Sequence, residues 1–450
     1  MKQNKITLIG AGSVNFSLGI IRDICKTEAL RGSRVCLMDI NAERLDAVYA
    51  LALRINRDFG GDLAIEKTLD RTEALEGSDF VVSTALTVPH ARFAEGLEIA
   101  KKWGFRYGGS YHVMYDEAFW VNFYQFRFLE DLTEDILRLC PDAWHLMVEN
   151  PVISGVTLLM RKYPDVKMVG LCHGFNDVFD MAEVLGYCRD DVTFEVSGVN
   201  HFLWLSGGRL KGEPFTDVLD RWIEEHGEEY WKDCGLSAVF SRKRIDFYRK
   251  NGILPIGDTL GFSGASWPWW YHTDDETEKK FGEYTPQAAW DWYFGHVKNM
   301  TEQVMKIAGD PDSDLNGLLK HFVTDDLIVP LIESVAGDIP RPHVINTLNR
   351  GHLVPGIPED FEVEISALCS ADGIRPITAT PLPKHIVAHI LRDRVAPVEM
   401  ELAAYENGSL EMLKELVLMD KWAVSSRQVD GFVGEILDLP YHSEMKAHYR

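Results

Sequence analysis

The first part of the chain alternates short apolar runs with longer amphipathic segments. The apolar runs predict strands at Ile6–Gly10, Arg34–Asp39, Leu63–Thr68, Phe80–Ala85, His145–Val148 and Val166–Cys172. The segments between them have helical periodicity, and include Ala42–Arg57, Ala91–Trp103, Glu117–Leu139 and Ile153–Arg161. Strands that alternate with helices predict a doubly wound parallel sheet, so the expected fold class is α/β with a Rossmann-like N-terminal domain.

The pattern changes after about residue 190. Antiparallel strands are expected at Val192–Val199, Phe202–Leu205 and Arg209–Lys211, followed by helices near Phe215–Glu225 and Leu236–Lys250. The C-terminal part is strongly helical, at His385–Asp393, Ala396–Tyr405, Leu410–Met419 and Gln428–Leu437. No low-complexity linker separates the halves. We therefore expect a Rossmann-like domain over residues 1–190, and a mixed α+β lobe for substrate, metal and oligomerisation packed intimately on it over residues 191–450.

Charge and composition exclude several classes of partner. Among 450 residues, 46 Lys and Arg stand against 69 Asp and Glu, which gives a formal charge of −23. Such a surface repels phosphate backbones and anionic lipid, so neither nucleic acid nor a membrane is an expected partner. The start carries no apolar secretory segment, and the seven cysteines are scattered singly. A reducing cytoplasm is the expected location.

A glycine-rich turn follows the first predicted strand. Gly10-Ala11-Gly12-Ser13 lies where a strand passes into a helix, so its backbone amides can approach a pyrophosphate at the helix N-terminus. Asn15 replaces the third glycine of the usual fingerprint. Asp39, at the end of the second predicted strand, is placed to bind ribose hydroxyls, which favours NAD over its phosphorylated relative. The alternative is a tight turn that binds no ligand.

Two further polar residues lie at or near predicted strand ends. Cys172 ends an apolar strand, and His201 follows a strand in Val199-Asn200-His201. A thiolate and an imidazole, with other positions left for water or substrate oxygens, suit a divalent transition metal. Taken singly, each residue is more often a buried core residue than a metal ligand. Asp258, in Gly257-Asp258-Thr259, likewise has the alternative of an ordinary turn residue.

Five ordered motifs together resemble the NAD- and manganese-dependent glycosidases of glycoside hydrolase family 4. These motifs are Tyr115-Asp116, Asn150-Pro151, Cys172-His173-Gly174, Gly198-Val199-Asn200-His201 and Pro255-Ile256-Gly257-Asp258-Thr259. The likeness continues through Asn349-Arg350-Gly351 to the helical end. Departures are Glu149, where relatives often have a small or hydroxyl residue, Leu260-Gly261-Phe262, and the aromatic run Trp267–His272. These put the sugar preference in question rather than the chemistry.

The resemblance implies hydrolysis of an α-linked terminal sugar by redox-assisted elimination rather than by a pair of carboxylates. NAD oxidises C3, a base removes the C2 proton, the glycosidic oxygen leaves, and the hydride returns after water adds. The resemblance assigns Cys172 and His201 to a divalent metal such as Mn²⁺, and Asp116 and Asn150 to substrate. Asp258 is then the candidate base, and His173 the candidate acid. Gly10, Gly12, Ser13 and Asp39 would bind NAD.

The substrate class and the assembly are less narrowly defined. The expected partner is a small saccharide: an α-glucoside or α-galactoside, with α-glucuronides and α-galacturonides as the alternative within the family. A homodimer or homotetramer is expected because relatives commonly form one. A 2-hydroxy-acid dehydrogenase would share the N-terminal domain. Such enzymes usually need a catalytic segment of the Gly-Glu-His-Gly type, which this sequence lacks. A non-catalytic NAD-binding regulator would bind cofactor without any metal dependence.

Overall fold

The computed structural model describes residues 3–13, 16–115, 117–233, 238–261, 267–281, 286–310, 312–320 and 328–450. Its strands are β1 (Lys5–Ile9), β2 (Arg34–Met38), β3 (Ala64–Thr68), β4 (Phe80–Ser83), β5 (Trp144–Met147), β6 (Met168–Gly170), β7 (Val192–Val199), β8 (Phe202–Leu210), β9 (Glu213–Pro214), β10 (Leu254–Ile256), β11 (Arg341–Leu348), β12 (Glu362–Ser370) and β13 (Gly373–Pro376).

The helices cover both faces of the sheet. They are α1 (Ser17–Lys26), α2 (Ala42–Asp58), α3 (Arg71–Leu75), α4 (His90–Lys102), α5 (Phe119–Leu139), α6 (Val152–Lys162), α7 (Asp177–Val184), α8 (Phe215–Asp233), α9 (Arg242–Asn251), α10 (Asp275–Phe281), α11 (Pro286–Ala308), α12 (Leu315–Leu319), α13 (Ile328–Ala336), α14 (Lys384–Ile390), α15 (Ala396–Asn407), α16 (Leu410–Leu418), α17 (Ser426–Leu437) and α18 (Ser443–His448). Within the described residues, no helix is long and apolar enough to cross a membrane.

One sheet runs through both halves of the chain. Over the described residues its strand order is β10-β8-β7-β12-β11-β6-β5-β4-β1-β2-β3, with β13 on β12 and β9 on β8. β1 to β6 are parallel, as the alternation of strands and helices predicts. The later strands are antiparallel, and they join the first part where Asn346 of β11 pairs with Gly170 of β6. The predicted α/β class with a Rossmann-like first part is confirmed.

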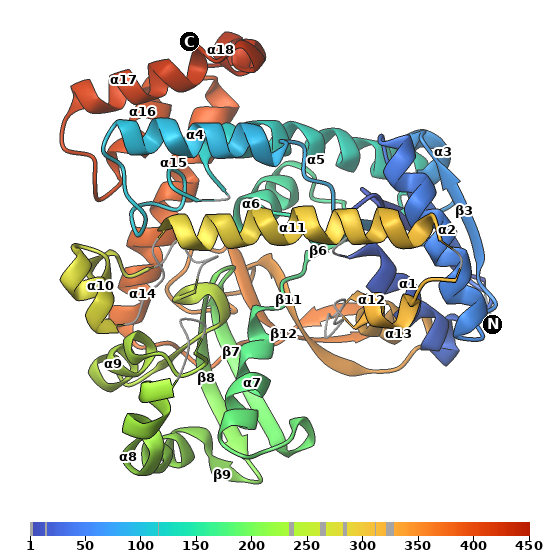
Figure 1. The fold of residues 1–450 in the computed structure, drawn as a ribbon, viewed down its shortest axis with the longest axis horizontal. Helices are drawn as coiled ribbons and strands as arrows, with labels where there is room; N and C mark the ends of the chain where they lie inside the picture. Colours follow the sequence, from blue (N-terminus) through green and yellow to red (C-terminus); the bar gives the residue numbers. More distant parts are fainter. Residues whose placement is uncertain are drawn as a thin grey trace.

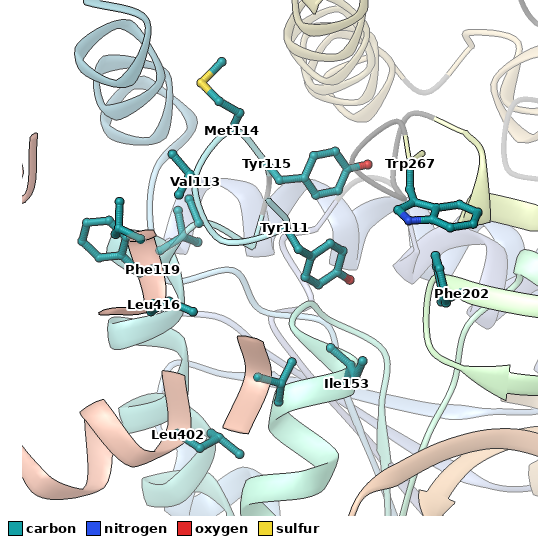
Figure 2. Close-up of a cluster of buried hydrophobic side chains, with 14 of the residues drawn as sticks. Tyr111, Val113, Met114, Tyr115, Phe119, Ile153, Phe202, Trp267, Leu402 and Leu416 are labelled. Carbon is teal, nitrogen blue, oxygen red and sulfur yellow. The ribbon is translucent and has the colours of Figure 1, made fainter. Parts of the chain in front are cut away.

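The halves also share apolar cores. One core joins α1, α2 and β1 to Met300 and Val304 of α11 and to Leu331 and Ile332 of α13. Figure 1 shows α11 running along the same side of the molecule as α4 and reaching α2. A second core packs α5 against the C-terminal helices, with Phe119, Leu402 and Leu416 among its buried members (Figure 2). The later half is thus built onto the first, as its lack of a linker predicts.

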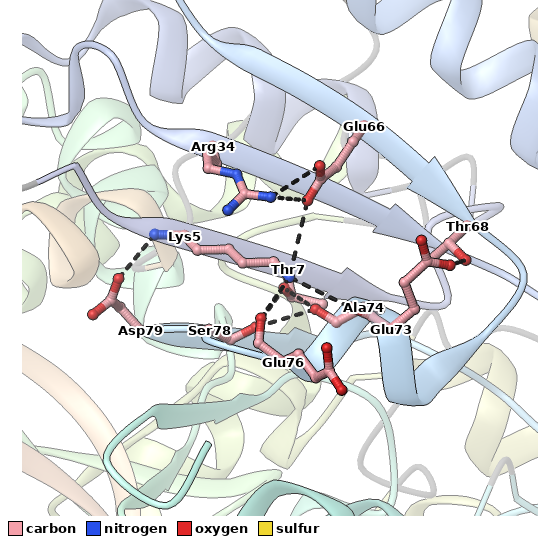
Figure 3. Close-up of polar contacts among 10 residues, drawn as sticks. All are labelled: Lys5, Thr7, Arg34, Glu66, Thr68, Glu73, Ala74, Glu76, Ser78 and Asp79. Atoms are coloured by element: carbon pink, nitrogen blue, oxygen red, sulfur yellow. Dashed lines mark hydrogen bonds and ion pairs between the residues drawn. The ribbon is translucent and has the colours of Figure 1, made fainter. Parts of the chain in front are cut away.

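Polar contacts fix the far end of the parallel sheet. Lys5 Nζ donates to the Glu76 carbonyl at 2.8 Å, and Thr7 Oγ1 donates to the Ala74 carbonyl at 3.0 Å (Figure 3). The neighbouring β2 and β3 are joined by Arg34, whose Nη2 lies 3.1 Å from Glu66 Oε1. The contacts of Lys5 and Thr7 hold α3 and the residue after it against β1.

Several predicted elements differ from the observed ones. β8 is one strand, although Ser206-Gly207-Gly208 was expected to end it; its pairing with β7 continues from Leu205↔Val196 to Gly207↔Glu195 through a bulge. The helix expected from Leu236 begins at Arg242, where Ser241 caps it by accepting from Arg244 N, and residues 234–237 lie outside the described part. β11 and β12 were not expected at all.

Candidate nucleotide and metal site

Gly10 and Gly12 form a tight turn after β1. The amides of Gly10 and Ala11 both donate to the Met38 carbonyl, at 3.0 and 2.9 Å, and Ser13 N donates to the Gly10 carbonyl at 2.8 Å. Gly10 has a φ of +84°, and a Cβ there would lie 2.7 Å from the Ala85 backbone. Only glycine suits that position. Val14 and Asn15 lie outside the described residues.

Asp39 is oriented by this turn. Its Oδ2 accepts from Gly12 N at 2.8 Å, and its Oδ1 accepts from Asn41 N at 2.8 Å. Each carboxylate oxygen keeps a lone pair for ribose hydroxyls. Beside it, Ile40 is 89% exposed and Leu86, after β4, is 51% exposed, so apolar surface is available to cover a base. The predicted nucleotide residues therefore lie together at the carboxyl edge of β1 and β2.

The predicted metal ligands and the predicted base also come together. Cys172 follows β6, His201 lies in the turn between β7 and β8, and Asp258 lies in a 3₁₀ turn, η4 (Gly257–Thr259), after β10. One ligand atom from each lies within 4.8 Å of the other two, and His201 Nε2 is 3.6 Å from Asp258 Oδ2. A thiolate, an imidazole and a carboxylate that converge in this way fit a divalent transition metal.

Backbone contacts hold the turns that carry these groups. Gly257 has a φ of +55°, and a Cβ there would lie 2.5 Å from the Gly174 carbonyl oxygen, so the Asp258 and Cys172 turns pack main chain against main chain. Asp177 Oδ2 accepts from Gly257 N at 2.7 Å and from Arg244 Nη2 at 2.6 Å. Thr259 Oγ1 accepts from Leu203 N at 2.7 Å, which ties η4 to β8 just after His201.

The second nitrogen of His201 faces a tyrosine. Tyr111 Oη lies 3.0 Å from His201 Nδ1 and donates to Glu117 Oε1. Burial lowers the pKa of His201 to about 4, so the ring is neutral near pH 7. An imidazole that binds a metal through Nε2 carries its proton on Nδ1, and Tyr111 Oη can accept a hydrogen bond from this N–H group. In Figure 2, Tyr111 and Tyr115 point away from Leu402 and Leu416, toward the side where Phe202 and Trp267 lie.

Two buried carboxyls of β12 hold Asn200, the residue before His201 of the predicted metal pair (Cys172 and His201). Asn200 N donates to Glu362 Oε2 at 3.1 Å, and Asn200 Nδ2 donates to Glu364 Oε2 at 3.2 Å. Burial raises the pKa of Glu364 to about 8 and that of Glu362 well above its ordinary value. Burial, with the Glu364 and Asp258 charges, also raises the pKa of the Cys172 thiol. The sequence reasoning missed these carboxyls, although Glu362-Val363-Glu364 alternates as strand residues on one face do.

The remaining predicted residues have different surroundings. His173 is exposed beside Cys172, and its charge contributes to the lowered pKa of His201. Asn150 ends the β5 region, half-buried, and joins Pro151 through a cis peptide bond. Asp116 lies outside the described residues. Trp267, the first residue of the aromatic run, is buried against Phe202 at 4.6 Å between ring centroids, so it contributes to packing in the core.

Comparison with known proteins gives the family. The model of the family 4 glycosyl hydrolases matches residues 5–186, and that of the family 4 glycosyl hydrolase C-terminal domain matches residues 196–423. The chain is 25% identical over 454 residues to an α-glucosidase of Erwinia rhapontici, covering 92% of this chain and 93% of that protein. It is 26% identical over 433 residues to an α-galactosidase of Bacillus subtilis, covering 92% of each.

A solved structure has the same fold. A 6-phospho-α-glucosidase from gut microorganisms, in complex with NAD and Mn²⁺, superposes with a TM-score of 0.79 at 16% identity, over 100% of this chain and 99% of that one. Together the two family models cover most of the sequence, including the nucleotide turn and the three converging side chains Cys172, His201 and Asp258. The chain belongs to the family 4 glycosyl hydrolases.

Proposed function

We propose that the protein hydrolyses α-linked terminal glycosides with NAD and a divalent metal, Mn²⁺ by preference. The observation that carries the proposal is the convergence of Cys172, His201 and Asp258 at the sheet edge that also holds the nucleotide turn. Two sequence relatives are α-glycosidases, and a protein of the same fold is described as a complex with NAD and Mn²⁺. The turn at Gly10 to Ser13 and the Asp39 carboxylate suit NAD.

When bound, NAD would accept and return the hydride of sugar C3, while the metal would polarise the C2 and C3 oxygens. The protein's own groups supply the rest. Cys172 and His201 hold the metal, and Asp258, whose side chain is 27% exposed, is placed to remove the C2 proton. His173 is exposed at the same edge and donates a proton to the leaving oxygen. Asn150 and Asp116 bind sugar hydroxyls.

Asp258 has two candidate roles because its carboxylate lies within reach of both a metal and a substrate. We assign it to the base because Cys172 and His201 leave further coordination positions that the sugar oxygens can fill. The Asn variant described in the Discussion separates the two roles.

The substrate panel and the cofactor requirement test the proposal together. The protein is stripped of NAD and metal, and then assayed on nitrophenyl α-glucoside, α-galactoside, α-glucuronide, α-galacturonide and 6-phospho-α-glucoside. We expect cleavage of an unphosphorylated α-glucoside or α-galactoside only when NAD and Mn²⁺ are both restored. Full activity in the stripped protein would refute the proposal. Preference for a uronide would select the alternative branch, and preference for the phosphorylated sugar would overturn the substrate ranking.

The same proposal includes location and assembly. The enzyme is proposed to be cytoplasmic, which fits the −23 charge and the free cysteines of the described residues. It is proposed to form a homodimer or homotetramer. Residues 1–190 would bind NAD, and residues 191–450 would complete the metal and substrate site. Light scattering of the purified protein tests the assembly.

A further inference from the structure

Three buried side chains form a hydrogen-bonded chain between the nucleotide turn and the metal pair. Glu149 Oε2 accepts from Ser83 Oγ at 2.8 Å and from Val148 N at 3.1 Å. Ser83 Oγ lies 2.8 Å from His145 Nε2. Ser83 and His145 are fully buried, and Glu149 is 4% exposed. None of the three has a role in the proposed chemistry.

The order of the strands places these three hydrogen-bonded side chains under the expected path of the cofactor. Asp39 lies at the end of β2, the glycine turn follows β1, and Cys172 follows β6, with β4 and β5 between β1 and β6. Four steps of ~4.8 Å separate β2 from β6. A dinucleotide whose ribose binds Asp39 and whose nicotinamide approaches the metal pair must therefore pass over the ends of β4 and β5. Ser83 ends β4, and Glu149 lies two residues beyond β5.

Glu149 has capacity for a further partner. Within the described part of the chain, its Oε1 is buried and has no hydrogen-bond partner. A buried carboxylate with one oxygen unsatisfied is costly unless a proton or a positive charge compensates it. The oxidised nicotinamide ring is a cation and the reduced ring is neutral, so the two cofactor forms differ in the compensation that they offer.

We propose that Glu149 distinguishes the oxidised from the reduced cofactor: as a carboxylate it favours NAD⁺, and as a neutral acid it favours NADH. The proposal rests on the NAD dependence put forward above. Ser83 donates to the carboxylate and so supports the ionised form, while the His145 ring of β5 stays uncharged because burial lowers its pKa to about 4. Burial raises the pKa of Glu149 to about 7, and among the described residues its other contributions are hydrogen bonds, from the backbone and from Ser83.

Proton release on cofactor binding tests this directly. Calorimetric titrations with NAD⁺ and with NADH, each in two buffers of different ionisation enthalpy, give the number of protons exchanged. Near pH 7 a group with this pKa is about half protonated, so NAD⁺ should release up to roughly half a proton per site, and NADH should release none. The carboxyl pKa should be lower in the NAD⁺ complex than in the NADH complex. Between pH values below and above both pKa values, the ratio of NAD⁺ to NADH affinity should rise about tenfold for each unit of that difference.

Two variants and a control define the outcome. Glu149→Gln should bind NAD⁺ without proton release. Ser83→Ala should move the pH of maximal release upward, because the carboxylate loses a donor. Asp142 lies two residues before β5, and its side chain is 99% exposed, so Asp142→Asn should behave like the parent. NAD⁺ binding with no proton release between about pH 6 and 8.5, or release retained by Glu149→Gln, would overturn the proposal. Failure to bind NAD⁺ at all would overturn the proposed function as well.

Discussion

Gly12 and Asp39 constrain each other at the nucleotide turn. A Cβ on Gly12 would lie 2.7 Å from Asp39 Oδ2, so an alanine must displace the carboxylate that is expected to bind the ribose. Overpacking of this kind costs about 1–3 kcal/mol, or roughly 5- to 150-fold in affinity.

We therefore expect Gly12→Ala to weaken NAD binding by that factor while Mn²⁺ binding stays near normal, both measured by calorimetry. Gly434→Ala is the control, because a Cβ there meets no atom within 4 Å. Unchanged NAD affinity in Gly12→Ala would show that the cofactor does not use Asp39.

Asp258 and the metal pair should respond differently to substitution. If Asp258 is the base, Asp258→Asn lowers turnover by about 10²–10⁴-fold and leaves NAD and Mn²⁺ affinity nearly intact. Cys172→Ser and His201→Ala instead weaken Mn²⁺ binding, with partial rescue at high metal concentration.

Deuterium incorporation gives the independent readout for that assignment. Turnover in heavy water should place deuterium at C2 of the product, since only elimination breaks that C–H bond. If Asp258→Asn loses Mn²⁺ affinity as strongly as Cys172→Ser does, Asp258 is a metal ligand and the base lies elsewhere.

At the scale of elements, Asp177 of α7 joins α9 to η4, the turn that carries Asp258. Its carboxylate accepts from Arg244, which is 9% exposed on the side chain, and from the amide of Gly257. Asp177→Ala leaves the guanidinium buried without its partner, which costs about 3–5 kcal/mol in the free energy of unfolding.

A paired variant separates stability from positioning. Asp177→Leu combined with Arg244→Met replaces the ion pair by apolar groups and should recover most of the stability in urea unfolding. Its turnover should stay below that of the parent, because Gly257 N still lacks its acceptor and the turn that carries Asp258 loses its anchor. Full recovery of turnover would mean that Asp177 does not position Asp258.

The elements that the sequence predicted well are those in which pattern and burial agree. β1, β2 and β4 are mostly apolar and almost wholly buried, so their position and their parallel order could be predicted. The glycine turn after β1 and Asp39 after β2 then gave the candidate nucleotide residues. β12 could not be predicted, because Glu362 and Glu364 are charged residues at buried positions, a pattern that indicates an exposed segment. Tyr111 and Glu117 could not be assigned to His201, since only the fold brings them together.

At the scale of the whole molecule, Asp420 connects the C-terminal helices to the segment that carries Tyr111. The carboxylate accepts from Ser110 N at 2.5 Å and from Trp422 N at 2.7 Å, and burial raises its pKa from 3.8 to about 6. Because the folded state holds this proton more tightly than the unfolded state does, its contribution to stability is largest below the unfolded pKa and is lost as pH rises through about 6.

We expect this group to lower the free energy of unfolding by about 2–3 kcal/mol between about pH 4 and pH 7.5. Asp420→Asn should lose this part of the pH dependence, as measured by urea unfolding at several pH values. Identical pH profiles for the parent and Asp420→Asn would contradict the expectation.

The junction between β6 and β11 gives the metal a second consequence. The two parts of the sheet pair there through Gly170 and Asn346, and Cys172 follows two residues after Gly170. Of the two proposed metal ligands, Cys172 comes from the first half of the chain and His201 from the second. An ion held by both would therefore be a cross-link between the halves, and part of its binding free energy would become cohesion of the whole molecule. Removal of manganese should then lower the stability of the protein as well as its activity.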